Sequence, residues 1–245
     1  MFPELFSWGF IHVRSWGVLI AVAFLVVMSL ISASAKKIKL MTPDDVLEGG
    51  IIAIFCGVLG ARIAFVVEYW PLFKSDWKEI LMIQHGGLVF YGGLFLALIS
   101  LVVWARARKF SLIKILDITA PAMLIGIGIG RIGCFLNGCC YGKLTTHPWG
   151  RHFLDVPGIV HPTQLYEFMG AVALGLLAYA LGRVRKFNDG QMLGLCFIFY
   201  GVLRFGIELL RVNPVYYSLS SAQWISLGLM AGGICLFFYG RRRPQ

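Results

Sequence analysis

Three arginines that lie within apolar runs, Arg62, Arg131 and Arg204, are the residues of this sequence that point most directly to chemistry. An arginine inside a membrane helix costs at least ~2.5 kcal/mol by insertion scales, so three of them need an explanation. A guanidinium group binds phosphate through paired hydrogen bonds, and the phosphate available in a membrane is a lipid headgroup. Tyr200 and Glu208 lie four residues on either side of Arg204 and share its helix face. The pattern predicts a polar chamber that binds an anion.

A purely structural explanation of these arginines is the alternative. Each would then be neutralised by a carboxylate that is nearby in the fold, and no ligand would be needed. The candidate pairs are Arg131 with Glu167, Arg204 with Glu208, and Arg62 with Glu48 or Glu68.

Three cysteines, Cys134, Cys139 and Cys140, occupy the glycine-rich segment 130–142, GRIGCFLNGCCYG. They are small residues that helix packing tolerates, or Cys134 forms a disulfide or redox pair with Cys139 or Cys140 in an oxidising compartment. A metal site that adds His147 is the third alternative. The spacing C-x4-C-C-x6-H matches no usual zinc pattern, so we expect no metal.

The composition indicates a membrane protein. Of 245 residues, 58% are hydrophobic and 14% are charged, and the mean hydropathy is +0.78. A soluble domain carries about a quarter charged residues. The net charge of +10 does not indicate nucleic-acid binding, because the basic residues form short clusters at the ends of apolar runs.

Seven apolar runs are long enough to cross a membrane as helices, which requires about 20 residues. They span 16–35, 46–70, 86–105, 112–136, 164–182, 190–210 and 222–240. Basic clusters follow the first, third, fifth and seventh runs, so the positive-inside rule places the amino terminus outside and the carboxyl terminus in the cytoplasm. We therefore expect an all-α integral membrane protein, with a single transmembrane domain over residues 1–245 and an external insertion at about 137–163. The three arginines then lie in the outer half of the bilayer.

Five short segments carry a resemblance to a known family. They are GRIGCFLNG at 130–138, HPTQLYE at 161–167, YGVLRFGIELLR at 200–211, GARIAFV at 60–66 and GGLVFYGG at 86–93. In order and spacing they resemble the motif blocks of the bacterial prolipoprotein diacylglyceryl transferases, over nearly the whole chain.

The resemblance implies an enzyme of lipoprotein maturation. Members transfer the diacylglyceryl group of phosphatidylglycerol to the lipobox cysteine thiol of an exported preprolipoprotein and release glycerol phosphate. The expected partners are therefore phosphatidylglycerol, such preprolipoproteins and the surrounding membrane lipids, with no nucleic acid and no cofactor. The expected location is the bacterial inner membrane, which the chain would cross several times.

The resemblance also implies roles for individual residues. Arg131 and Arg204 take the positions of the family's essential arginines and would hold the phosphodiester, with Arg62 as a further candidate. The positions that would complete the phospholipid site are Asn137, Gly142, Glu167, Tyr200 and Glu208.

Three positions depart from the family pattern. Tyr91 stands where the family often has a histidine that is proposed to activate the thiol, Cys134 replaces an asparagine, and Cys139 replaces a glutamate. A phenol is a poor base at neutral pH. His85, six residues before Tyr91, is an alternative catalytic base by position. The group that activates the thiol is left unassigned between them.

Two other functions compete with the transferase. A membrane thiol–disulfide oxidoreductase built on Cys134, Cys139 and Cys140 would normally contain a C-x-x-C pair, and the sequence has none. A non-catalytic phospholipid-binding relative would bind the headgroup without forming product. Neither explains the HPTQLYE and YGVLRFGIELLR segments together.

Overall fold

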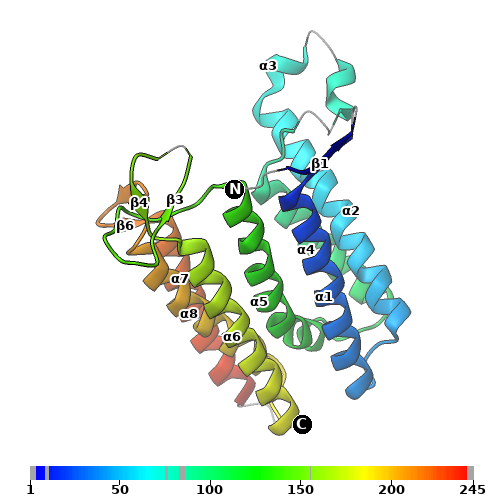
Figure 1. Ribbon diagram of the computed structural model, residues 1–245. Coiled ribbons are helices and arrows are strands. Elements are labelled where there is room, and N and C mark those ends of the chain that lie inside the picture. Colours follow the sequence, from blue (N-terminus) through cyan, green and yellow to red (C-terminus); the bar gives the residue numbers. More distant parts are fainter. Residues whose placement is uncertain (1–3, 9–10, 75–76, 83–85, 155, 242–245) are drawn as a thin grey trace. The chain divides into compact units, whose positions relative to one another are not determined.

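The structure, a computed structural model, describes residues 4–8, 11–74, 77–82, 86–154 and 156–241 (Figure 1). Within them, seven helices are long and apolar enough to cross a membrane, which confirms the predicted fold class. These helices are α1 (Ser15–Lys37), α2 (Pro43–Glu68), α4 (Phe90–Ala107), α5 (Leu112–Asn137), α6 (Thr163–Val184), α7 (Gln191–Glu208) and α8 (Ser221–Arg241). The orientation of the termini stays a prediction.

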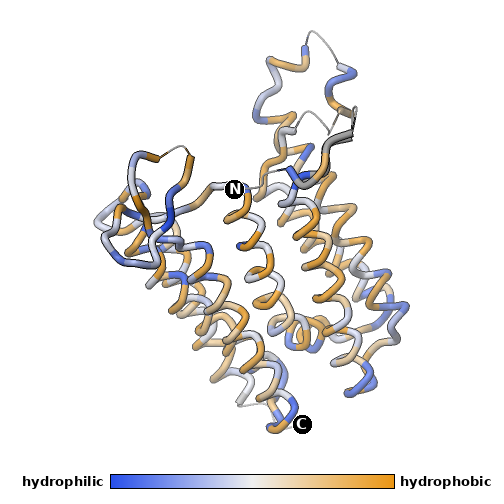
Figure 2. Tube along the Cα trace, viewed as in Figure 1, coloured by the Kyte–Doolittle hydropathy of each residue, from blue (hydrophilic) through white to orange (hydrophobic). Residues whose placement is uncertain are grey.

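Hydropathy along the chain separates the helices from their connections. Figure 2 shows the long helices coloured mostly as hydrophobic, with hydrophilic residues gathered near their ends and in the loops. Because a helix pairs its backbone N–H and C=O groups internally, such segments can lie in lipid without unsatisfied polar groups. The chain is therefore built as a multi-pass membrane protein.

Short elements occupy the connections. A one-turn helix α3 (Trp70–Phe73) and a 3-10 helix η1 (Trp77–Leu81) follow α2. Three antiparallel strand pairs are formed by β1 (Glu4–Trp8) with β2 (Ile11–Arg14), β3 (Arg151–His152) with β4 (Ile159–Val160), and β5 (Val215–Tyr216) with β6 (Leu219–Ser220). The β3–β4 pair lies in the insertion that the sequence predicts at 137–163.

Local sequence sets the helix boundaries. Thr42 caps α2, because its side chain accepts a hydrogen bond from the Asp45 N–H while the Asp45 carboxylate accepts one from the Thr42 N–H. Pro43 follows at the first helical position, where its missing N–H costs nothing. Helix α4 begins later than predicted, because Gly86 and Gly87 have φ of 86° and 79°, which a right-handed helix does not allow.

The chain forms two compact units. Residues 32–112 make the smaller unit, which contains α2 and α4, and residues 1–31 and 113–245 make the larger one, which contains α6, α7, α8 and nearly all of α5. In the larger unit α7 packs between α6 and α8 (Figure 1). A buried cluster joins α5, α6 and α7 through Ala120, Leu124, Ala178, Met192, Leu193 and Cys196. The single domain expected for residues 1–245 stays a prediction.

The close approach of α2 and α4 generates a prediction for the smaller unit. A Cβ atom on Gly60 would lie 2.5 Å from the carbonyl oxygen of Gly92 and 2.6 Å from Cβ of Leu96. We expect Gly60→Ala to lower the free energy of unfolding by about 1–3 kcal/mol, because the two backbones must separate. Gly228→Ala in α8, where a Cβ atom would meet no described atom within 4 Å, is the matched control. Thermal unfolding of the detergent-solubilised protein measures both, and equal midpoints would contradict the prediction.

Candidate active site

A shared carboxylate joins three helices of the larger unit. Glu167 on α6 is 1% exposed and lies between Arg131 of α5 and Arg204 of α7. Its Oε2 is 3.0 Å from Nε of Arg131, which confirms the predicted ion pair, and 3.9 Å from Nη1 of Arg204. Its Oε1 accepts a hydrogen bond of 2.9 Å from the Tyr200 hydroxyl. We call these four side chains, together with Glu208 and Arg211, the arginine network.

The second carboxylate of the network neutralises Arg204 from another side. Glu208 lies one turn further along α7, and its Oε2 is 3.0 Å from Nη2 of Arg204, as the i,i+4 spacing predicts. Its Oε1 accepts hydrogen bonds from the Ser220 hydroxyl, at 2.8 Å, and from the Asn213 amide. The turn between α7 and α8 therefore holds Glu208 in place.

The network has an excess of positive charge. Arg211, three residues after Glu208, acts electrostatically on that carboxylate, so three guanidinium groups face two carboxylates. Nη1 of Arg204 and Nε of Arg211 are buried and have no hydrogen-bond partner among the described residues. The 3.9 Å between Nη1 of Arg204 and Glu167 is an ion-pair distance but too long for a hydrogen bond. A buried donor without an acceptor costs about 1–3 kcal/mol, so the arrangement suits an added anion that accepts hydrogen bonds.

Arg62 lies in the smaller unit, where backbone carbonyl groups surround its side chain. The residue is 6% exposed, and its guanidinium donates to the carbonyl oxygens of Glu79, Ile80, Met82, Gly86 and Gly87. Glu48, one of its two predicted partners, pairs with Arg108 instead. Arg62 thus holds residues 79–82 and 86–87 against α2, and a role in phospholipid binding stays a prediction.

Tyr91, one of the two candidates for the thiol-activating base, also belongs to the smaller unit. Tyr91 lies in the first turn of α4, is 67% exposed, and packs its ring edge-on against Phe90. His85 lies outside the described residues. Their catalytic roles stay predictions.

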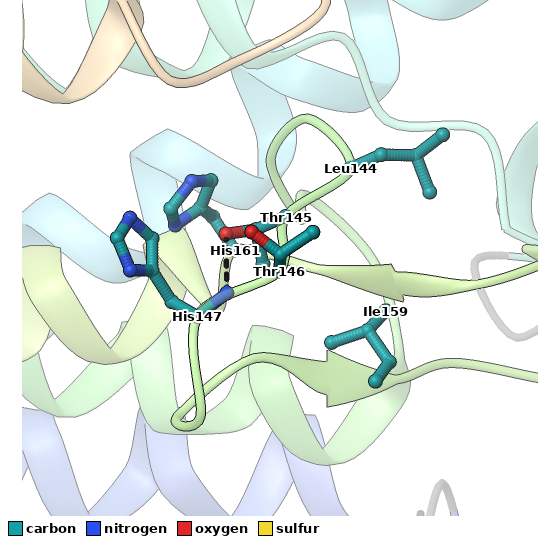
Figure 3. Close-up of a pocket in the computed structure, with 6 residues that line it drawn as sticks. All are labelled: Leu144, Thr145, Thr146, His147, Ile159 and His161. Carbon is teal, nitrogen blue, oxygen red and sulfur yellow. Dashed lines mark hydrogen bonds between the residues drawn. The ribbon is translucent and has the colours of Figure 1, made fainter.

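An open hollow of ≈ 460 Å³ lies in the insertion between α5 and α6. It is lined by Leu144, Thr145, Thr146, His147, Ile159 and His161. Figure 3 shows the two histidines near each other, with the backbone N–H of His147 donating to the Thr145 hydroxyl oxygen at 3.2 Å. The HPTQLYE segment contributes His161 to this hollow and Glu167 to the arginine network, so it connects the two.

Close backbone contacts explain why residue 142 is a glycine. Its N–H donates to the His161 carbonyl oxygen at 2.9 Å, and a Cβ atom at this position would lie 2.5 Å from the carbonyl oxygen of Leu210. Only glycine lets the loop after α5 approach the end of α7 in this way. Asn137, the last residue of α5, is exposed and its side chain hydrogen-bonds Cys139. Whether either residue touches a phospholipid stays a prediction.

The structure brings together the three cysteines that the sequence singles out. Cys134 lies in the final turn of α5, and its Sγ and those of Cys139 and Cys140 all lie within 4.8 Å of one another. All three are free thiols in this structure. The first turn of α6 fixes the loop, because the Thr163 hydroxyl donates to the Cys140 carbonyl oxygen and the Gln164 amide to that of Cys139. A disulfide or redox role for them stays a prediction.

The pKa values of Cys139 and Cys140, which follow α5, are shifted in opposite directions. A hydrogen bond from the Cys134 thiol lowers the pKa of Cys140 to about 5, and the charges of Arg211 and Arg131 favour the same thiolate. Burial raises the pKa of Cys139. The thiolate form is therefore favoured more at Cys140 than at Cys139.

Several residues of the site escaped the sequence analysis. Arg211 closes the YGVLRFGIELLR segment, and its position three residues after Glu208 is a signal that could have placed it on the same helix face. Asn213 reaches Glu208 from the loop that follows α7. Ser220 reaches it only because β5 and β6 turn the chain back, and no helical spacing relates Ser220 to that carboxylate.

The burial of Glu167 generates a prediction for stability. We expect Glu167→Gln to lower the free energy of unfolding by about 3–5 kcal/mol, because Arg131 and Arg204 would lose a shared buried counter-charge. The same change at Glu48, whose pair with Arg108 is 39% and 48% exposed, should cost no more than about 1 kcal/mol. Thermal unfolding in detergent measures both variants. Equal effects would show that the network does not hold the helices together.

The chain is similar to known proteins over nearly its whole length. A family profile described as prolipoprotein diacylglyceryl transferase matches residues 3–239. A protein from Clostridium tetani named phosphatidylglycerol--prolipoprotein diacylglyceryl transferase is 33% identical, over 100% of both chains. Proteins of the same name from Finegoldia magna and Salmonella choleraesuis are 32% and 30% identical, over 92% and 99% of this chain and 90% and 94% of their own. The chain belongs to the prolipoprotein diacylglyceryl transferase family.

Proposed function

We propose that the protein transfers the diacylglyceryl group of phosphatidylglycerol to the lipobox cysteine of exported preprolipoproteins and releases glycerol phosphate. The observation that carries the proposal is the arginine network, in which three partly buried guanidinium groups face two carboxylates and keep buried donor atoms without acceptors. The family and the names of the relatives support the same reaction.

The phosphodiester of the donor lipid is the anion that this network suits. Arg131 contacts Glu167 through Nε, which leaves its two Nη groups for the lipid, and Arg204 offers Nη1. A single negative charge balances the excess charge of the three guanidinium groups. Glu167 and Glu208 hold the arginines in fixed orientations, so little reorganisation is needed when charge develops on the phosphate.

The reaction is a displacement at carbon. The acceptor sulfur attacks, as a thiolate, the glyceryl carbon that carries the phosphate. A C–S bond forms, and the C–O bond breaks with its electron pair remaining on the phosphate oxygen. The leaving group is glycerol phosphate, whose developing charge Arg131 and Arg204 stabilise. The proton of the thiol is lost before the attack.

The site belongs, in this proposal, to the outer leaflet of the bacterial inner membrane. Basic clusters follow α1, α4, α6 and α8, which supports a cytoplasmic location for those helix ends. Arg131 and Arg204 lie near the opposite ends, the carboxyl-terminal ends of α5 and α7. The donor lipid and the exported acceptor would therefore meet at this face.

The competing functions have less support. A thiol–disulfide oxidoreductase built on the three cysteines would leave the arginine network without a role, and membership of the family favours the transfer. A phospholipid-binding relative without activity would use the network but would give no product. A transfer assay separates it from the enzyme.

The arginine network generates a prediction for activity. Purified protein is mixed with phosphatidylglycerol and a lipobox peptide, and mass spectrometry follows the gain of the diacylglyceryl group. We expect Arg131→Lys and Arg204→Lys each to lower the rate at least about tenfold, because lysine keeps the charge but loses the paired hydrogen bonds. Arg108→Lys, in an exposed ion pair of the smaller unit, is the matched control and should keep the rate within about twofold.

Two results would contradict the proposal. Wild-type rates in both network variants would show that these arginines do not hold the headgroup. Phosphatidylglycerol that stays bound to the wild-type protein without product would identify a lipid-binding relative.

A further inference from the structure

The proposed transfer gives no role to the three cysteines that meet at the end of α5. Cys134, Cys139 and Cys140 bring their Sγ atoms within 4.8 Å of one another. The remaining cysteines of the chain, Cys56, Cys196 and Cys235, lie on α2, α7 and α8. Three thiols that converge from a helix end and the following loop form the ligand set of a thiophilic metal ion.

The distances between the thiols fit a tetrahedral cation. With Zn–S bonds of about 2.3 Å, the sulfur ligands of a tetrahedral zinc lie roughly 3.8 Å apart. The Sγ atoms of Cys139 and Cys140 are 3.4 Å apart, and every pair among the three lies within 4.8 Å. Side-chain movements of about an ångström therefore bring three sulfurs onto one cation.

The backbone of the loop is bent so that neighbouring thiols face one side. Successive side chains of an extended chain point in opposite directions. Cys140 breaks this alternation with a φ of 69°, in the left-handed region, two residues after Gly138 with a φ of 78°. A residue other than glycine costs roughly 1–2 kcal/mol in that region, and such strain is concentrated at functional sites. Hydrogen bonds from Thr163 and Gln164 hold the strained loop in place.

Nearby arginines suit the charge of a thiolate–metal centre. Three thiolates and one divalent cation carry a net charge of −1. Arg131 acts electrostatically on Cys134 and Cys140, and Arg211 acts on Cys140. Because Arg131 also pairs with Glu167, the metal centre and the arginine network would be neighbours.

We propose that Cys134, Cys139 and Cys140 bind one Zn²⁺ ion through three thiolates and leave its fourth position open for the acceptor thiol. The use of the fourth position rests on the proposed function. Three protein ligands with an open position are typical of catalytic zinc sites, whereas structural sites have four. The spacing C-x4-C-C argues against a metal in sequence alone, because it does not reveal that the loop folds back onto the helix end.

The cation would activate the acceptor thiol, for which Tyr91 is a poor base. A thiol that coordinates a metal ion is deprotonated, and its proton passes to water. The sulfur then forms the C–S bond to the glyceryl carbon while the C–O electron pair leaves with glycerol phosphate. The product is an uncharged thioether, which is a weak ligand and leaves the cation. The cysteine ligands are unchanged and no oxidant or reductant is consumed.

The metal site is tested by titrating the full-length, reduced and chelator-treated protein in detergent with Co²⁺ alone. We expect one equivalent per chain and a sulfur-to-cobalt charge-transfer band. Cys134→Ser, Cys139→Ser and Cys140→Ser should each weaken binding at least about tenfold. Cys235→Ser, which changes an exposed cysteine on α8, is the matched control and should leave binding unchanged. Elution volume and thermal midpoint confirm that each variant is folded.

Three outcomes would overturn the metal site. The first is a reduced wild-type protein without the band, and the second is a band that survives in all three variants. The third is a disulfide among the three cysteines, seen by mass spectrometry of the freshly isolated protein under non-reducing conditions, with no zinc bound.

The open position is tested on the Co²⁺-loaded protein without any phospholipid. A lipobox peptide should change the cobalt spectrum, and its serine counterpart should not. If the cobalt spectrum does not change when the cysteine peptide is added, the proposed role of the open position is overturned. Transfer by protein that binds no metal would overturn this inference and keep the proposed function. A cobalt centre that binds the peptide while no transfer occurs would support the metal site and contradict the function.

Discussion

One buried carboxylate, that of Glu167, ties α6 to an arginine on each of two other helices. It contacts Arg131 and Arg204 and accepts a hydrogen bond from Tyr200. Inside a bilayer these groups have no water as an alternative partner, so the helices have to meet with the charged residues at matching depths. The contacts of Glu167 fix the position of the ends of α5 and α7. The loop with the cysteines and the turn around Glu208 start from these two helix ends.

The sequence predicts the helices and the ion pairs because both follow from simple spacing rules. The thickness of a bilayer sets the length of each apolar run, and the i,i+4 relation alone pairs Arg204 with Glu208. Similar depth in the membrane predicts the pair of Arg131 and Glu167. Arg62 is different, because its partners are carbonyl groups of an irregular segment, and no periodic pattern shows where such a segment runs.

The contacts that depend on loop conformation could not be predicted from the sequence. Ser220 reaches Glu208 because the chain reverses between β5 and β6. No periodic pattern of apolar residues in the sequence predicts such a reversal. The Sγ atoms of Cys139 and Cys140 lie 3.4 Å apart because the backbone of Cys140 adopts a left-handed conformation that residues other than glycine rarely take. The spacing of cysteines in the sequence and their separation in space therefore lead to different conclusions about a metal.

Arg62 depends on a part of the chain that is synthesised after it. Its guanidinium donates to carbonyl groups 17 to 25 residues further on. During synthesis α2 reaches the membrane before that segment, and until the segment arrives the helix carries an unpaired cation in lipid, at a cost of at least ~2.5 kcal/mol. Stable insertion of α2 therefore waits for the carbonyl groups of Glu79, Ile80, Met82, Gly86 and Gly87, which come shortly before α4 in the chain. The two helices would thus enter the bilayer as one hairpin, and biogenesis of this unit would be cooperative.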